Sequence, residues 1–350
     1  MIKQHYLRNY LSELPDFVFS YIEEYYSGES LNTQIGYSLD VRTFLNYLRI
    51  FKHPEVKKNE DFTLRHINSV TPSDLIRFKA YLREYETEYT SPSGKKIKRI
   101  CKNSAFGINR KLSAVRGLFI YLYKTEQISQ NVTDKVDFVK LHHKIKKPLT
   151  TQETIKLIDV IYNGEKYFEG RALTEYNNRK MRDRALFTAY LGTGVRVSEL
   201  INMQISDVDF DMQSFIVTRK GGDEQEIFMP VQVNNALWEY LEPDSEDART
   251  QGPLFLGRGG KPLTVAAVEK NLKSYCYTVG ITHPDKTRPH ALRRTFACRL
   301  LEDGVDIKMV AELMGHKNIE VTHRYYAQYS KEARREVMTN LDVLRESDKK

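Results

Sequence analysis

PHALRRTFACRLLEDGVDIKMVAELMGHKNIEVTHRYYAQ, residues 289–328, is the stretch of the chain that most narrows its fold and its chemistry. His290 and Arg293 lie three residues apart in it, so one turn of a helix would point both side chains the same way. Pro289, directly before them, is typical of a first helical turn. Taken alone, the pair is more simply explained as a partly buried histidine beside a surface arginine.

The second half of the same stretch displays a histidine and two tyrosines after a helix end. Gly315 is predicted to end the preceding helix in a left-handed conformation, which places His316 at a bend. His316 is there suited either to donate to a phosphate oxygen or to cap the carbonyl groups of that helix. Tyr325 and Tyr326 follow nine and ten residues after His316, and only this distance distinguishes them among the 22 tyrosines of the chain.

Two motifs further upstream add positive charge. LGTGVRVSEL, residues 191–200, places Arg196 where a glycine turn leads into a helix, so that its guanidinium and the helix N-terminus can bind phosphate oxygens together. VTRKGGDEQEIF, residues 217–228, places Lys220 at the tip of a predicted hairpin. The alternative is a surface ion pair between Arg196 and Glu199, with an exposed Lys220 that serves solubility.

Taken together, these residues suit attack on a phosphodiester without a metal ion. That reaction needs a nucleophile, cations around the non-bridging oxygens and an acid for the leaving oxygen. Nearby cations favour the phenolate of a tyrosine, whose ordinary pKa is about 10. The sequence shows no carboxylate cluster of the kind that holds two catalytic metal ions, so we expect neither a metal nor a cofactor.

Length and composition limit the number of domains and the class of partner. The 350 residues suffice for two domains, and a net charge of +8 with an isoelectric point near 9.1 favours a polyanionic partner. The three cysteines are far apart and show neither a disulfide framework nor metal-ligand spacing. A signal-peptide core and a long apolar run are both absent from the sequence, which predicts a cytoplasmic protein with no membrane partner.

Residues 1–139 are predicted to form an all-helical domain. Apolar residues recur at helical spacing from Val41 to Leu48, from Leu75 to Leu82 and from Ile108 to Leu122. Thr71 is expected to cap the second of these helices, with proline in its first turn.

Positive charge is concentrated between Ser91 and Lys147, where 14 Lys or Arg residues stand against three acids. The segment runs through an expected loop at 91–99, a helix and a linker. This continuity favours contact with the DNA backbone over a merely solvated face. The candidate DNA-binding residues are Lys95, Lys96, Lys98, Arg99 and Arg110.

The second half of the chain is predicted to mix helices with a few strands. Residues 140–149 form a basic linker, after which Thr150 and Glu153 make a capping box that starts a helix. Residues 162–182 are predicted to be a polar insertion, and 214–229 a hairpin. The fold class is therefore mostly α, with a helical N-terminal domain and an α+β domain that contains a small antiparallel sheet.

Residues 148–335, approximately, resemble the catalytic half of the tyrosine recombinases, or phage-type integrases. The resemblance lies in the order of the motifs, which is GVRVSEL, then a hairpin lysine, then HALRRTFA, then LMGH with a tyrosine nine residues after the histidine. The resemblance implies a SAM-like core-binding domain at 1–139, a catalytic domain at 150–335 and a tail at 336–350 that contacts a neighbouring protomer. It also implies a set of catalytic residues with Glu199 in support. That set is Arg196, Lys220, His290, Arg293, His316 and Tyr325.

The function implied by this resemblance is site-specific recombination of double-stranded DNA by a homotetramer on paired sites. Strands would be cleaved and rejoined through a 3′-phosphotyrosyl intermediate, without ATP. The motifs LGTGVRVSEL, SDVDF and VTRKGG are most similar to those of Xer recombinases that act as a single protein on chromosome dimers. Arg294 occupies a position at which many members of the family have histidine.

Three alternatives remain open from the sequence. The chain could be the integrase or excisionase of a phage or conjugative element, since the chemistry is shared. It could be a catalytically silent DNA-binding protein, or a structural chromosome-organising protein that uses only the basic helical half. The target sequence, the direction of exchange and any accessory protein are not encoded in these motifs.

Overall fold

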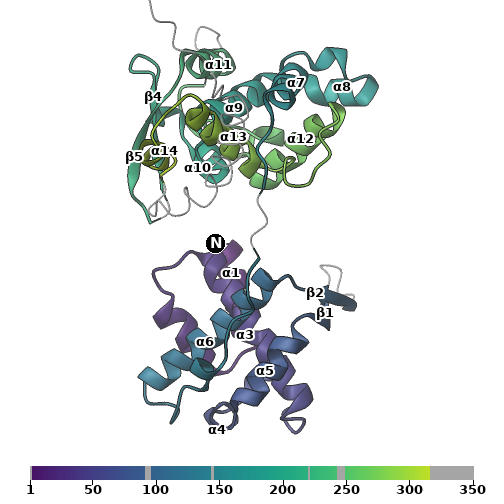
Figure 1. The fold of residues 1–350 in the computed structure, drawn as a ribbon, viewed down its shortest axis with the longest axis vertical. Coiled ribbons are helices and arrows are strands. Elements are labelled where there is room, and N and C mark those ends of the chain that lie inside the picture. Colours follow the sequence, from purple (N-terminus) through teal and green to yellow (C-terminus); the bar gives the residue numbers. More distant parts are fainter. Residues whose placement is uncertain (1, 91–95, 143–145, 220, 243–248, 316–350) are drawn as a thin grey trace, which may run out of the picture. The chain divides into compact units, whose positions relative to one another are not determined.

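The computed structural model describes residues 2–90, 96–142, 146–219, 221–242 and 249–315. It divides into two units, Met1–His143 and Lys144–Lys350 (Figure 1). The division lies inside the segment 140–149 that the sequence marks as a linker. Most of the described elements are helices, with two small antiparallel sheets, which confirms the predicted fold class.

The first unit is built around two long helices, α3 and α6, that pack against each other. Its elements are α1 (Ile2–Leu11), α2 (Asp16–Ser20), α3 (Leu31–Phe51), α4 (Leu64–Asn68), α5 (Pro72–Tyr81), β1 (Glu84–Thr90), β2 (Lys96–Lys102) and α6 (Ala105–Lys124). One aromatic ring from each of α3, α5 and α6 meets at the centre, where Phe44 lies 5.0 Å from Phe78 and 6.2 Å from Phe119 between ring centroids. All three rings are buried, so the apolar faces expected from helical spacing are confirmed.

The local signals that start these helices also act as expected. Thr71 caps α5: its hydroxyl accepts from the N–H of Asp74, and the Asp74 carboxylate accepts from the N–H of Thr71. Pro72 occupies the first turn, where a missing N–H costs nothing.

The expectation of an all-helical N-terminal domain needs one correction. β1 and β2 form an antiparallel hairpin, so Lys96 to Arg99, expected in a loop, belong to a strand. The sequences EYETEYT and KIKRICK lack the apolar run that usually marks a strand. They pair instead through opposite charges across the strands, as between Lys98 and Glu86 at 2.9 Å.

The second unit combines helices with a three-stranded sheet of order β3-β4-β5. Its elements are α7 (Thr151–Tyr162), α8 (Gly170–Asn177), α9 (Lys180–Thr193), α10 (Val197–Asn202), β3 (Val208–Asp209), β4 (Ser214–Thr218), β5 (Glu224–Phe228), α11 (Val231–Leu241), α12 (Val265–Thr278), α13 (Pro289–Glu302) and α14 (Ile307–Leu313). Thr150 and Glu153 form the expected capping box at the start of α7. The hairpin expected at 214–229 is β4 and β5, with Phe215 opposite Ile227.

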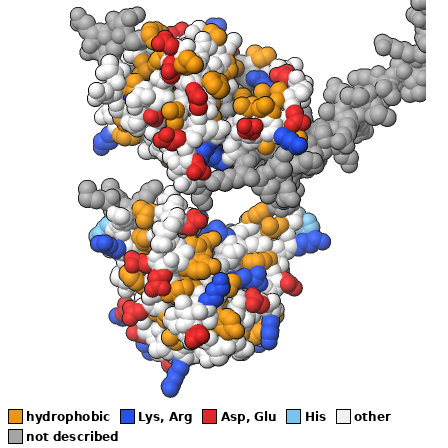
Figure 2. Space-filling model, turned by 90° about the vertical axis from the view of Figure 1, so that its left-hand side faces the viewer, with side chains coloured by type: hydrophobic (Ala, Val, Ile, Leu, Met, Phe, Trp, Pro, Cys, Tyr) orange, Lys and Arg blue, Asp and Glu red, His pale blue; other side chains and the backbone are white. Residues whose placement is uncertain are grey.

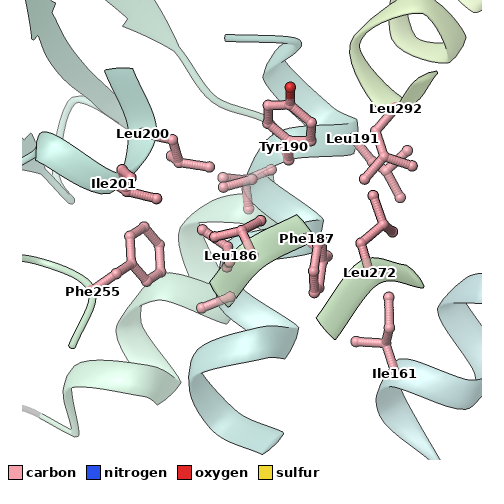
Figure 3. Packing of buried hydrophobic residues seen from close by; sticks show 14 of the residues in the cluster. Ile161, Leu186, Phe187, Tyr190, Leu191, Leu200, Ile201, Phe255, Leu272 and Leu292 are labelled. Atoms are coloured by element: carbon pink, nitrogen blue, oxygen red, sulfur yellow. The ribbon is translucent and has the colours of Figure 1, made fainter. Parts of the chain in front are cut away.

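Helix α9 is the centre of this unit because it is buried on nearly all sides. Leu186, Phe187, Tyr190 and Leu191 project from it in different directions, as Figure 3 shows. They meet residues of five other segments around the helix. These residues are Ile161, Leu200, Ile201, Phe255, Leu272 and Leu292. A central helix packed in this way gives its C-terminal end a fixed position.

The insertion at 162–182 is polar in composition but anchored by aromatic rings. It contains α8 and the start of α9. Tyr176 is fully buried, and its hydroxyl donates to the carbonyl of Ile161 on α7. Phe168 packs 5.6 Å from Tyr176, so the insertion is part of the core of this unit.

Candidate active site

The C-terminal end of α9 leads directly into the first arginine of the site. Gly194 ends the helix with φ +62°, and a Cβ there would lie 2.2 Å from the Phe296 ring, so both the conformation and the space call for glycine. Arg196 then caps α10, with its backbone N–H donating to Glu199 Oε2 at 2.8 Å. Its guanidinium donates to Glu199 Oε1 at 2.6 Å.

The ion pair considered as the simpler explanation for Arg196 is thus present, but it is not a surface pair. The Glu199 side chain is only 4% exposed, whereas that of Arg196 is 33% exposed. A buried carboxylate that receives hydrogen bonds from both the main chain and the side chain of one arginine fixes that guanidinium in place. The outer edge of Arg196 therefore faces solvent in a defined orientation.

Arg293 is buried, contrary to the explanation of a surface arginine. It lies on α13 and is 4% exposed. One terminal nitrogen donates to the carbonyl of Gly194 at 2.6 Å, and the other donates to the carbonyl of Met314. Arg293 therefore ties the end of α9 to the end of α14. Its desolvation, followed by the nearby charge of Arg196, lowers its pKa to about 10, so it is still charged at neutral pH.

Arg219, at the end of β4, was missed by the sequence reasoning and belongs to the same cluster. It is 8% exposed, and its guanidinium donates to Glu199 Oε2 at 2.6 Å and to Gln225 Oε1 at 2.8 Å. Burial lowers its pKa. The alternation along β4 is the signal that could have found it, because Phe215 and Val217 share its inward face.

The cluster carries more positive than negative charge. Arg196 and Arg219 share the one carboxylate of Glu199, and Arg293 binds carbonyl oxygens. The buried Nη2 of Arg219 has no hydrogen-bond partner among the described residues. Arg196 and Arg219 also line a pocket of about 290 Å³, together with the carboxylates of Glu199 and Asp207.

His290 lies on the first turn of α13, one turn before Arg293. It is exposed at the surface of the unit. Desolvation by its neighbours, and then the charges of Arg293 and Arg294, lower its pKa below the ordinary value. A histidine with a lowered pKa is neutral at pH 7, and a neutral imidazole is able to accept a proton.

Three of the predicted catalytic residues, Lys220, His316 and Tyr325, lie outside the described residues. The residue before each of the first two is described. Arg219 precedes Lys220, and Gly315 precedes His316. The carbonyl of Gly315 accepts from Arg196 Nη2 at 3.3 Å, and a Cβ on Gly315 would lie 2.7 Å from the Arg219 guanidinium carbon. The described chain thus ends in contact with the arginine cluster.

Known proteins are similar to this chain in sequence and in fold. Residues 165–332 match the model of the phage integrase family. The tyrosine recombinase XerC of Pediococcus pentosaceus is 30% identical over 223 residues, which cover 62% of this chain and 70% of that protein. XerC of Listeria innocua is 28% identical over 298 residues, which cover 81% of this chain and 91% of the relative.

The chain belongs to the phage integrase family of tyrosine recombinases.

It is therefore a site-specific recombinase of the tyrosine type, with Xer recombinases among its relatives. Two solved structures share the fold of this recombinase. XerH bound to palindromic difH after cleavage has a TM-score of 0.65 at 19% identity, over 89% of this chain and 80% of the other. The Tn1549 transposon integrase in complex with a circular intermediate DNA has a TM-score of 0.62 at 21% identity, over 92% of this chain and 99% of the integrase chain.

The DNA-contact residues expected in the first unit of the recombinase lie in charge-balanced surroundings. Lys98 pairs with Glu86, and Arg110 donates to both oxygens of the buried Asp40. Arg99 is exposed on β2, the backbone of Lys96 starts that strand, and Lys95 lies outside the described residues. The count of 14 basic against three acidic residues therefore omits the acids of β1 that face this strand.

Charges of both signs are also interspersed on the face of the molecule in Figure 2. Among the described residues, no helix is both long and apolar enough to cross a membrane.

Proposed function

We propose that this recombinase cleaves and rejoins DNA through a covalent 3′-phosphotyrosyl intermediate, with Tyr325 as the nucleophile. The observation that carries the proposal is the shared carboxylate. Arg196 and Arg219 both bind Glu199, Arg293 is buried beside them, and the surplus positive charge lies next to the segment that continues to His316. Such a cluster suits the two negative charges of a pentacoordinate phosphate in the transition state.

In the first step the phenol oxygen of Tyr325 attacks the scissile phosphorus and the bond from phosphorus to the 5′ oxygen breaks. The phenol proton passes to His290, whose neutral imidazole is available at pH 7. Lys220 gives a proton to the departing 5′ oxygen. Arg196 and His316 bind the non-bridging oxygens. Arg293, whose terminal nitrogens hold the carbonyls of Gly194 and Met314, adds its positive charge beside them.

In the second step the 5′-hydroxyl of a partner strand attacks the phosphotyrosine and releases Tyr325. The number of phosphoester bonds is unchanged, so the exchange needs no ATP. Glu199 and Arg219 act as positioning residues in this scheme, because they hold Arg196 in place.

The partner of this reaction is double-stranded DNA at paired target sites, bound by a tetramer of this chain. The two fold neighbours are the Tn1549 integrase in complex with a circular intermediate DNA and XerH bound to its difH substrate. Residues 1–139 would form the core-binding domain, 140–149 the linker and 150–335 the catalytic domain. The tail 336–350, outside the described residues, has Val337, Leu341 and Leu344 at helical spacing and would dock on a neighbouring protomer.

The cellular role that we propose is resolution of chromosome dimers, because the similar sequences are XerC proteins. A second candidate is the integrase of a mobile element. XerH and a transposon integrase have similar TM-scores to this chain, and the fold alone does not separate the two roles. This supports the mobile-element integrase as a second candidate.

Trapping the protein on DNA tests both the chemistry and the role. A nicked substrate that loses its 5′-hydroxyl strand after cleavage should leave the protein covalently attached. Sequencing genomic fragments attached to the protein in cells should then give one site near the replication terminus. Fragments from the ends of a mobile element would favour the second candidate. No covalent fragment under any condition would support a catalytically silent DNA-binding protein.

A further inference from the structure

We propose that the first unit of this protein holds a divalent transition-metal ion of the zinc class, bound by His53, Glu55 and His66. The three residues lie where α3 ends and α4 begins, within the unit Met1–His143. One ligand atom from each lies within 4.8 Å of the other two. His66 lies 13 positions after His53 and 11 after Glu55, so the fold is what brings it to the other two.

The distances between ligand atoms suit a tetrahedral ion. His53 Nδ1 lies 2.9 Å from Glu55 Oε1, and His66 Nε2 lies 3.9 Å from the same oxygen. In a tetrahedral zinc site with bonds of about 2.0–2.1 Å, neighbouring ligand atoms lie about 3.3 Å apart. The two observed distances fall on either side of that value. All three ligand atoms lie within 4.8 Å of one another, and rotation of the side chains would have to bring the longer separations toward about 3.3 Å to enclose an ion.

The nitrogen of each ring that faces away from the cluster already has a hydroxyl beside it. His53 Nε2 lies 3.2 Å from Ser69 Oγ, and His66 Nδ1 lies 3.1 Å from Thr63 Oγ1. When one ring nitrogen binds a metal ion, the other carries a hydrogen and needs an acceptor that fixes the ring. In the metal-free ring, His66 Nδ1 accepts from the backbone N–H of Thr63 at 3.0 Å. Metal binding at Nε2 needs the proton on Nδ1, so the ring would have to turn away from the Thr63 N–H and donate to Thr63 Oγ1 instead.

A hydrogen-bonded pair explains only part of this cluster. The 2.9 Å contact accounts for His53 and Glu55, but Nε2 of His66 is 3.9 Å from the carboxylate, which is longer than a hydrogen bond. The two rings nevertheless lie 4.8 Å apart between centroids. The buried ring of Phe62 packs 5.6 Å from His66 and 6.1 Å from His53, which gives the cluster an apolar wall.

Burial and donor type indicate the class of ion. The side chains of His53 and His66 are 12% and 24% exposed, whereas that of Glu55 is 61% exposed. The ion would thus sit at the surface, with water in the fourth position. Two imidazoles and one carboxylate favour zinc and similar ions over magnesium or calcium, which prefer oxygen ligands.

The ion would tie the end of α3 to the start of α4. Its effect would fall on the stability of the first unit, because Arg196, Arg219, Arg293 and Glu199 all belong to the second. This inference does not depend on the recombination chemistry proposed above.

Titration of the full-length, chelator-treated protein tests the site. Calorimetry with zinc chloride should show one saturable site, and cobalt should give ligand-field absorption bands at the same stoichiometry. Glu55→Gln and His53→Gln should each weaken binding at least ~10-fold, since even the loss of a hydrogen-bond partner of a ligand costs roughly that much. Zinc should raise the melting temperature of the wild type and leave that of Glu55→Gln unchanged.

Two controls keep the test specific. Glu55 is largely exposed, so Glu55→Gln should keep the circular dichroism spectrum of the wild type. His142→Gln, an exposed histidine of the linker, and Cys101→Ser should bind zinc as the wild type does. Absence of saturable binding, equal binding by wild type and Glu55→Gln, or an equal loss in the His142→Gln control would each overturn the proposal.

Discussion

Glu199 and Arg219 form a buried ion pair, with 2.6 Å between Oε2 and Nη1 and side chains only 4% and 7% exposed. The other carboxylate oxygen holds Arg196 at the same distance. One buried acid therefore sets the positions of two guanidiniums. This makes Glu199 the residue on which the arrangement of the site depends most.

Replacing Glu199 by glutamine should destabilise the second unit by about 3–5 kcal/mol, because removal of one partner from a buried pair leaves uncompensated charge. Urea unfolding followed by tryptophan fluorescence measures this effect in the right unit, since Trp238 on α11 is the only tryptophan of the chain. Glu224→Gln, at an exposed acid on β5, is the matched control and should change stability by less than about 0.5 kcal/mol. Equal unfolding curves for both variants would contradict the assigned importance of Glu199.

Replacing Arg196 or Arg293 by alanine should each slow cleavage at least ~10²-fold, the scale seen when one donor to a developing oxyanion is lost. Single-turnover cleavage of a nicked half-site measures the rate. Arg299→Ala, on the same helix as Arg293, should stay close to the wild type. Cleavage should also persist in EDTA, since arginines supply the charge at the phosphate. A near-normal rate for Arg293→Ala would remove that residue from the site.

The pH dependence of cleavage should report His290. Its pKa lies below the ordinary value of about 6.5, so the ring is neutral and able to accept a proton at pH 7. As pH falls through the lowered pKa, the ring becomes protonated and the rate should fall. His290→Gln should be slower at pH 7 and should lack this acidic limb. An acidic limb of unchanged position and depth in His290→Gln would assign it to another group.

Binding of DNA should weaken with salt, and removal of charge from residues 95–99 should reduce that dependence. Neutralising Lys95, Lys96, Lys98 and Arg99 to glutamine lowers the log–log slope by about 0.9 for every phosphate contact that is lost. Affinity measured from low to moderate salt gives the slope. The exposed pair Lys57 and Lys58, outside the basic segment, is the control. An unchanged slope would mean that the acids of β1 already neutralise this strand.

Local signals predicted much of the fold because their causes are local. Thr71 with Asp74 and Thr150 with Glu153 form capping boxes between residues three positions apart, and Gly194 ends its helix in a left-handed conformation that glycine adopts readily. The β1–β2 hairpin was missed because its strands are polar and lack an apolar pattern. They pair through opposite charges across the two strands.

Part of the arginine cluster was predicted from the sequence for a similar reason. Arg196, Glu199, His290 and Arg293 stand in short motifs with helical spacing. Arg219 was passed over because a residue next to a hairpin tip is usually exposed, whereas here β4 packs against α10 and Gly315 lies against the guanidinium. The cluster of His53, Glu55 and His66 depends on how α3 and α4 meet, which no sequence spacing specifies.

Tyr325 and Tyr326 are adjacent, and a comparison of Tyr325→Phe with Tyr326→Phe distinguishes which of the two forms the covalent bond to DNA. Each variant is incubated with a nicked half-site, and covalent adducts are separated under denaturing conditions, with DNA binding measured in parallel. We expect Tyr325→Phe to bind DNA normally and form no adduct, because only the phenol oxygen is lost, whereas Tyr326→Phe should still form one. An adduct with Tyr325→Phe and none with Tyr326→Phe would contradict the assignment.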